Sequence, residues 1–131
     1  MTPPDQHSRG QRLWAFSAHA SMVFILTSYT LFLGPLAAYL IYFFNRRGSP
    51  WVAVNGLQAT FYQLLMITLV VVLGSPAVMG SGVVHPAALL VVLFGGLLYA
   101  LIGASVCLLG REFRYPLLGG WAQAIVNRLG R

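Results

Sequence analysis

The sequence predicts an all-α integral membrane protein, in which a four-helix transmembrane bundle is followed by a short interfacial amphipathic helix at the C-terminus. The first observation is composition: the 131 residues are 58% hydrophobic and only 8% charged, too apolar for a soluble domain of this length. The second is that residues 13–45 and 48–110 contain no Asp, Glu, Lys or Arg. The third is that all eight basic residues are arginines outside these stretches, in the pairs Arg9/Arg12, Arg46/Arg47, Arg111/Arg114 and Arg128/Arg131.

The arginine pairs also predict the orientation of the chain. Arg and Lys accumulate on the cytoplasmic side of membrane proteins, so we expect a multi-pass protein of the bacterial cytoplasmic (inner) membrane with both termini inside. The pairs are separated by long apolar stretches and do not form one basic stripe, which argues against nucleic acid as a partner. The predicted anionic partner is instead the headgroup layer of the lipid bilayer.

The first third of the chain contains an arm and a segment too long for one span. Residues 1–10 are polar and contain prolines, which predicts a disordered arm. As one helix, residues 11–44 would extend about 50 Å, beyond the ~30 Å hydrocarbon core, and Gly34-Pro35 is the expected break. A hairpin and a single kinked span both remain open. The hairpin is favoured because it returns Arg46/Arg47 to the side of Arg9/Arg12, although its second arm is short for a full crossing.

The rest of the chain predicts two cleaner spans and a surface helix. A helix begins near Trp51, an uncharged loop at 74–85 suits the outer side, and Pro86 begins the most apolar span. Four apolar residues share one face of the tail and predict an interfacial helix: Leu118, Trp121, Ile125 and Leu129. The predicted organisation is an arm at 1–10, a membrane domain at 11–116 with helical arms at about 13–30, 31–45, 51–73 and 86–109, and an interfacial helix at 117–131.

The scarcity of acidic and metal-binding residues argues against enzymatic chemistry. Asp5 and Glu112 are the only acids, and each stands alone. Catalysis by paired carboxylates is therefore excluded, as is a proton relay built on buried acids. The sequence also has no phosphate-binding glycine loop and no Cys/His cluster at metal-ligand spacing. We therefore expect no catalytic residues, no metal site and no cofactor.

One histidine lies inside an apolar segment. His19 is an intramembrane ionisable residue, a class that is often functional, and it could ligate a haem iron or a pigment metal. The alternative is a neutral ring that hydrogen-bonds Ser17, Ser21 or a backbone carbonyl. This alternative is favoured because no second buried histidine supplies an opposing ligand.

Two further groups of polar residues are candidate contact surfaces. Asn55, Gln58 and Tyr62 share one helix face with Gln63 beside them, and they are interpreted as a polar path, a partner surface or internal hydrogen-bonding groups. The basic turns are predicted to contact lipid headgroups or a partner, with ordinary cytoplasmic anchoring as the simpler explanation. Their candidate residues are Arg46, Arg47, Arg111, Arg114 and Tyr115.

Several short motifs occur in a set order along the chain. They are His19-x-Ser21, Gly34-Pro35, an apolar arm ending in Arg46/Arg47, Ser49-Pro50-x-Val52-x-x-Asn55-Gly56-x-Gln58-Ala59, Tyr62-Gln63, Gly110-Arg111 and Arg114-Tyr115-Pro116. With these motifs the chain resembles, over about residues 13–118, the bacterial Tic20-like four-helix membrane protein family of unknown function. It departs from that pattern at Ala20, where the family usually has Leu, and at Phe61-Tyr62-Gln63, where it usually has Asn-Phe-Gln. The resemblance implies a four-helix fold and a role in protein translocation or complex assembly.

Because the sequence shows no catalytic groups, we expect the protein to act through the contacts that its helix surfaces make. The leading hypothesis is a non-enzymatic accessory or scaffolding subunit of a larger membrane complex, or a homo-oligomer. The first alternative is a transport or protein-translocation element with a polar path along Asn55, Gln58 and Tyr62. The second is a haem- or pigment-holding subunit that uses His19.

Overall fold

The computed structural model describes residues 7–26 and 31–129, and within these ranges it contains helices and no strands. The elements in chain order are α1 (Arg9–Ala20), the 3-10 helix η2 (Ser21–Leu26), α2 (Leu33–Asn45), α3 (Pro50–Leu73), α4 (Pro76–Gly80), α5 (Pro86–Leu108) and α6 (Leu118–Leu129). The all-helical prediction is confirmed for the described residues.

Most of the helices begin at a capping side chain. Ser8 and Gln11 form a reciprocal capping box at the start of α1. The caps of α3, α4 and α5 are Ser49, Ser75 and His85, and each is followed by a proline in the first turn. Proline is tolerated there because the first backbone N–H groups of a helix have no intrahelical acceptor. These local signals explain why the sequence predicts the starts of α3 and α5 to within one residue.

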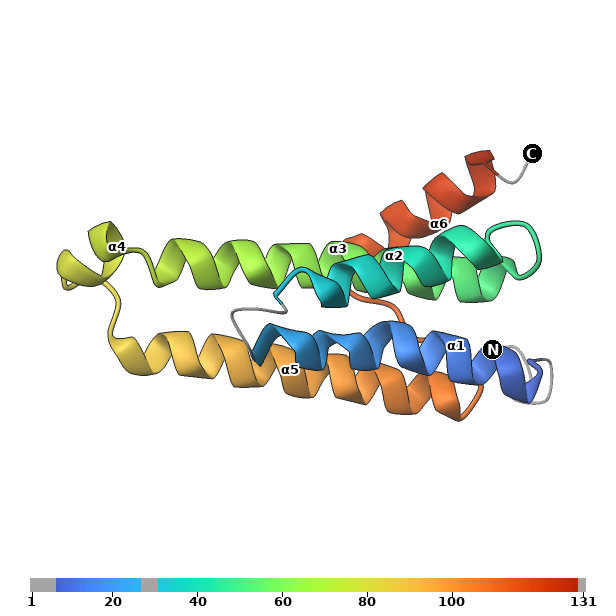
Figure 1. Cartoon of the computed structure of the whole chain (residues 1–131), viewed down its shortest axis with the longest axis horizontal. Coiled ribbons are helices and arrows are strands. Elements are labelled where there is room, and N and C mark those ends of the chain that lie inside the picture. Colours follow the sequence, from blue (N-terminus) through green and yellow to red (C-terminus); the bar gives the residue numbers. More distant parts are fainter. Residues whose placement is uncertain (1–6, 27–30, 130–131) are drawn as a thin grey trace.

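Helices α3 and α5 form a long antiparallel pair, with α2 beside α3 and α1 beside α5 (Figure 1). The segments α1–η2 and α2 return the chain to the end of the bundle where it began, so this stretch is a hairpin and not one continuous helix (Figure 1). The start of α1, the turn after α2, the end of α5 and the end of α6 all lie toward that end (Figure 1). The described arginines are therefore gathered at one end of the bundle.

Helix length separates two kinds of arm. Helices α3 and α5 contain 24 and 23 residues and are long and apolar enough to cross a membrane. Helix α2 contains 13 residues, about 20 Å of helix, which is short of the ~30 Å hydrocarbon core. Two of the four predicted arms thus meet the length requirement for a full span. A complete four-span bundle is not established by these dimensions.

Three details differ from the sequence-based expectations. Helix α1 begins inside the segment 1–10 that was predicted as an arm, whose residues 1–6 lie outside the described part of the chain. Gly34-Pro35 lies within the first turn of α2, where proline is tolerated, so the chain break precedes this motif. The predicted loop 74–85 contains the single-turn helix α4.

Helix α6 packs differently from its predicted apolar face. Gly119, Ala122 and Val126 are its buried residues, and α6 contacts α3. Trp121 and Leu129 remain 68% and 67% exposed. Small side chains such as Gly119 and Ala122 allow the two helix backbones to approach closely, while Leu118 and Ile125 pack at the edge of the core.

We expect Gly56→Ala to destabilise the bundle and Gly95→Ala to leave it intact. A Cβ on Gly56 of α3 would lie 2.7 Å from the Tyr42 backbone nitrogen and 3.1 Å from the Ala38 carbonyl oxygen, so α2 would have to move. Overpacking of this kind costs about 1–3 kcal/mol. On α5, a Cβ on Gly95 would meet nothing within 4 Å, and alanine is the better helix former. Thermal unfolding of both variants in mild detergent, followed by circular dichroism, is the measurement, and equal midpoints would contradict the close α2–α3 contact.

Candidate functional site

The polar residues singled out in the sequence meet inside the bundle. His19 on α1 and Asn55, Gln58 and Gln63 on α3 are each no more than 2% exposed. They are joined by Tyr115, which lies in the segment between α5 and α6 and is equally buried. We call His19, Asn55, Gln58, Cys107 and Tyr115 the polar network, because hydrogen bonds connect all five.

The Asn55 amide is the centre of the polar network. Its Oδ1 lies 3.2 Å from His19 Nε2, 3.0 Å from Gln58 Nε2 and 3.2 Å from Cys107 Sγ. Its Nδ2 donates to the Trp51 carbonyl oxygen at 2.9 Å, which fixes which end of the amide is the acceptor. A single side chain therefore connects α1, α3 and α5.

The partners of His19 determine its tautomer. The Asn55 oxygen can only accept, so His19 Nε2 carries the hydrogen of the neutral ring. The other nitrogen, Nδ1, lies 3.0 Å from the Tyr115 hydroxyl and accepts from it. Burial raises the pKa of Tyr115, which keeps this phenol protonated and able to donate. Both ring nitrogens are thus engaged, and no lone pair is left for a haem or pigment metal.

The rest of the predicted polar face is also bonded within the chain. Gln58 Nε2 donates to the Phe113 carbonyl oxygen at 2.7 Å. Gln63 Nε2 donates to the Ala18 carbonyl oxygen and to Ser21 Oγ, both at 3.0 Å. The Tyr62 hydroxyl donates to the Gly96 carbonyl oxygen at 2.9 Å. This geometry matches the interpretation of these residues as internal hydrogen-bonding groups.

The two glutamine carbonyl oxygens have no hydrogen-bond donor among the described residues. Each lies against a glycine: a Cβ on Gly34 would be 2.7 Å from Gln63 Oε1, and a Cβ on Gly119 would be 3.1 Å from Gln58 Oε1. Backbone Cα–H groups make weak contacts with such oxygens. Glycine at these two positions therefore makes room for a buried amide on α3.

Tyr115, one of the residues expected to contact headgroups, is 2% exposed and packs inside the bundle. Its ring stacks on Tyr62 with centroids 4.1 Å apart, and Phe113 packs edge-on against it. The neighbouring Glu112 and Arg114 point outward and are exposed. The alternation of charged and aromatic residues over 112–115 is the signal for this placement, because successive side chains of an extended segment point in opposite directions.

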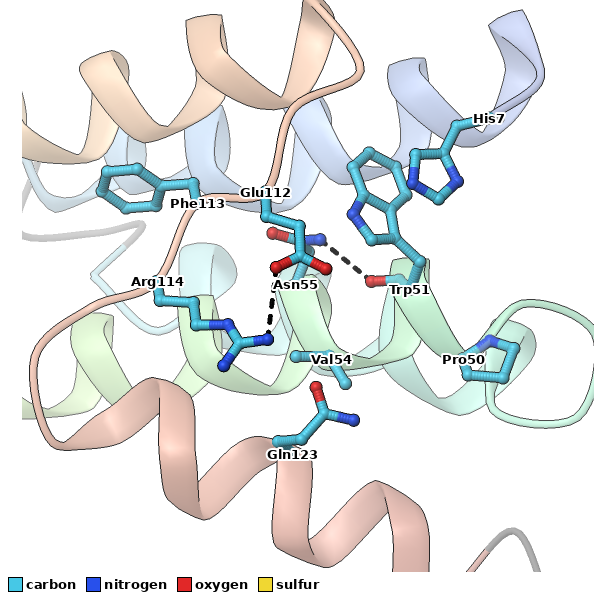
Figure 2. A pocket seen from close by; sticks show the side chains of 9 residues that line it. All are labelled: His7, Pro50, Trp51, Val54, Asn55, Glu112, Phe113, Arg114 and Gln123. Atoms are coloured by element: carbon cyan, nitrogen blue, oxygen red, sulfur yellow. Dashed lines mark hydrogen bonds and ion pairs between the residues drawn. The ribbon is translucent and has the colours of Figure 1, made fainter. Parts of the chain in front are cut away.

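A cavity of about 220 Å³ opens beside the polar network at the arginine end (Figure 2). Its lining residues are His7, Pro50, Trp51, Val54, Asn55, Glu112, Phe113, Arg114 and Gln123. The His7 ring stacks on Trp51 at 3.9 Å, and Arg114 pairs with Glu112 at 3.2 Å (Figure 2). Asn55 belongs to both the cavity wall and the polar network.

The groups around this cavity do not form a reactive centre. Partial burial lowers the pKa of His7, the Arg12 charge lowers it further, and Glu112 opposes both effects, so His7 is biased toward its neutral form. The described residues contain no group of three His, Cys, Asp or Glu side chains that could hold a metal ion. Glu112, the acid in the cavity wall, is already paired with an arginine.

The remaining candidate arginines lie around the same end of the bundle. Arg46 is half-buried, with its guanidinium 4.4 Å from the centroid of the Phe43 ring. Arg47 and Arg111 are exposed. None of these three side chains lines the cavity or belongs to the polar network.

The chain belongs to the MamF/MmsF family, described as the magnetosome magnetite crystal formation protein family, whose model matches residues 10–122. The resemblance to the Tic20-like family is therefore wrong. Its motifs have packing and capping roles here: Ser49 caps α3, Gly56 admits α2 and Gln63 bonds α1. Other small helical bundles can use the same devices, so they do not identify a family. No curated protein and no solved structure matches the chain.

We expect Asn55→Ala to destabilise the protein far more than Asn127→Ala. Removing the Asn55 amide leaves buried donors on His19, Gln58 and Cys107 without their shared acceptor, at a cost of about 1–3 kcal/mol for one unsatisfied group. Asn127 is exposed on α6 and bonds only Gln123, so its loss should matter little. Unfolding midpoints in detergent measure both effects. If the two variants unfold alike, the polar network does not hold the bundle together.

Proposed function

We propose that this protein is a non-enzymatic membrane component of magnetosome magnetite formation that acts as an accessory or scaffolding subunit. The assignment to magnetite crystal formation follows from the family to which the chain belongs. The observation that carries the accessory role is that the polar interior is occupied by its own hydrogen bonds, which leaves helix surface as the means of action.

The proposed topology places the arginine end on the cytoplasmic side, with both termini inside. Helices α3 and α5 cross the bilayer, and α1–η2 with α2 insert from the cytoplasmic side as a hairpin. Large apolar side chains of α5 support this placement, because a face containing exposed Leu90, Val91, Phe94 and Leu98 suits lipid and not water. In this arrangement residues 11–116 form the membrane domain, residues 1–10 lie in the cytoplasm, and the tail 117–131 lies at the headgroup level, where Trp121 is favoured.

Composition indicates how such a protein would influence a growing iron mineral. Hard cations prefer oxygen ligands, and carboxylates are the common protein source of them. This chain has two acids among 131 residues, and one of them is paired with Arg114. A mineral-binding acidic surface is therefore not supported. The effect on crystals is better assigned to contacts with other membrane subunits or with a second copy of the chain.

The two alternative functions receive no support from the site geometry. A polar path along Asn55, Gln58 and Tyr62 would need these side chains to face an open channel, but each donates a hydrogen bond inside the bundle. A cofactor ligand at His19 would need a free ring nitrogen, but both have partners.

Cysteine labelling tests the topology. In a Cys107→Ala background, we expect Ser81→Cys, next to α4, to react with a membrane-impermeant maleimide on spheroplasts. Gly48→Cys, in the α2–α3 turn, is expected to react only after permeabilisation. Both positions are exposed, so packing does not limit the reaction. Labelling of position 48 but not 81 from outside would show that the orientation is inverted.

Removal of the gene from a magnetite-forming bacterium tests the function. We expect magnetite crystals of altered size or number in electron micrographs, together with unchanged total cellular iron, because an accessory subunit acts on the assembly and not on supply. Restoring the wild-type gene is the control. Unaltered crystals would contradict the proposal, and a fall in cellular iron would favour the transport alternative.

A further inference from the structure

A second, smaller cleft lies between the end of α2 and the end of α6. Its volume is about 130 Å³, and its lining residues are Tyr42, Arg46, Arg47, Val126 and Leu129. Tyr42 and Val126 are each 5% exposed and pack in the same core cluster, so they form a firm apolar floor. Leu129 is largely exposed at the rim. The cleft therefore combines two arginine residues with an apolar base.

The two arginines of this cleft have no carboxylate partner among the described residues. The one acidic side chain in those ranges, Glu112, pairs with Arg114. Arg46 is instead held by its contact with the Phe43 ring, 4.4 Å from guanidinium carbon to ring centroid. Two adjacent positive charges that share a cleft, with no carboxylate partner among the described residues, favour binding of an anion.

Two other arginines at this end are already engaged. Arg12 Nε donates to the His7 carbonyl oxygen at 3.0 Å, and Arg114 bonds Glu112. Among the described residues, no carbonyl or carboxylate accepts a hydrogen bond from Arg46 or Arg47, and these two arginines line one cleft together. Guanidinium groups are well suited to phosphate, since their planar fork can bond two oxygens at once.

We propose that this cleft is a specific binding site for the phosphate headgroup of an anionic phospholipid. The proposal rests on the topology proposed above, in which the arginine end lies at headgroup level. Three of the five lining residues are apolar or aromatic, which fits a lipid whose glycerol and first acyl carbons lie along Tyr42 and Leu129. Free phosphate would gain nothing from that floor. A bound lipid would also connect the α2–α3 turn to α6, and so fasten the C-terminal helix to the bundle.

Native mass spectrometry of the detergent-purified full chain tests the site. Phosphatidylglycerol and phosphatidylcholine with identical acyl chains are titrated separately. We expect a tighter first phosphatidylglycerol adduct, weakened about ten-fold in the double variant Arg46→Gln/Arg47→Gln. The matched control Arg9→Gln/Arg111→Gln removes the same charge from the same end outside the cleft, and is expected to change the affinity less than about two-fold. No preference for phosphatidylglycerol, or equal weakening in both double variants, overturns the proposal.

A second variant separates lipid from free phosphate without changing charge. Leu129→Gln alters the exposed rim of the cleft and is expected to weaken the phosphatidylglycerol adduct several-fold while the unfolding midpoint stays constant. Displacement of phosphatidylglycerol by millimolar inorganic phosphate, with no effect of Leu129→Gln, would make the ligand a free anion and overturn the lipid assignment. The maleimide labelling above reports on topology independently, so failure of the cleft and failure of the orientation are distinguishable.

Discussion

The hydrogen bonds around the Asn55 amide constrain the whole bundle. In an apolar medium a broken buried hydrogen bond is not replaced by one to water, so polar contacts fix the relative positions of helices that apolar packing alone would allow to slide. Asn55 bonds His19 on α1, Gln58 one turn along α3 and Cys107 on α5. Hydrogen bonds of about 3 Å require the backbones of α1, α3 and α5 to lie close together. Helix α2 can also approach α3 closely, because Gly56 has no Cβ. Close helix packing at the glycines and hydrogen bonding by the buried amides therefore stabilise the same bundle together.

The connection from α5 to α6 completes this arrangement. Phe113 and Tyr115 point inward to the polar network, and the chain then turns at Leu117, whose φ of 66° is costly for a residue with a Cβ. The turn directs α6 along α3, where Gly119 meets Gln58. The position of α6 thus follows from the buried residues before it. This explains why Gly119 and Ala122 are buried while Trp121 and Leu129 stay exposed; the other two residues of the expected apolar face, Leu118 and Ile125, are partly buried against the core.

Local signals were sufficient for the helices and insufficient for the site. A proline in the first turn and an uninterrupted apolar run predict α3 and α5 to within one residue, and Arg46/Arg47 marks the end of α2. The sequence predicts a neutral His19 that bonds Ser17, Ser21 or a backbone carbonyl, whereas the partners are Asn55 and Tyr115, 36 and 96 residues away. No short-range pattern contains such pairings, since they depend on how the helices pack. The motifs behind the mistaken family resemblance have capping and packing roles in this structure, so they carry little information about which family the chain belongs to.

The distribution of charge limits how this protein can affect a mineral. In the proposed topology, the end away from the arginines is built from residues of 48–110, which contain no acid and one imidazole, His85. That imidazole caps α5 by accepting from the Ala87 backbone N–H at 3.2 Å. The opposite end carries the arginines and repels cations. Neither charge pattern favours binding of iron by carboxylates. The accessory role proposed above is consistent with this distribution, because the apolar and basic surfaces suit contacts with lipids and neighbouring helices.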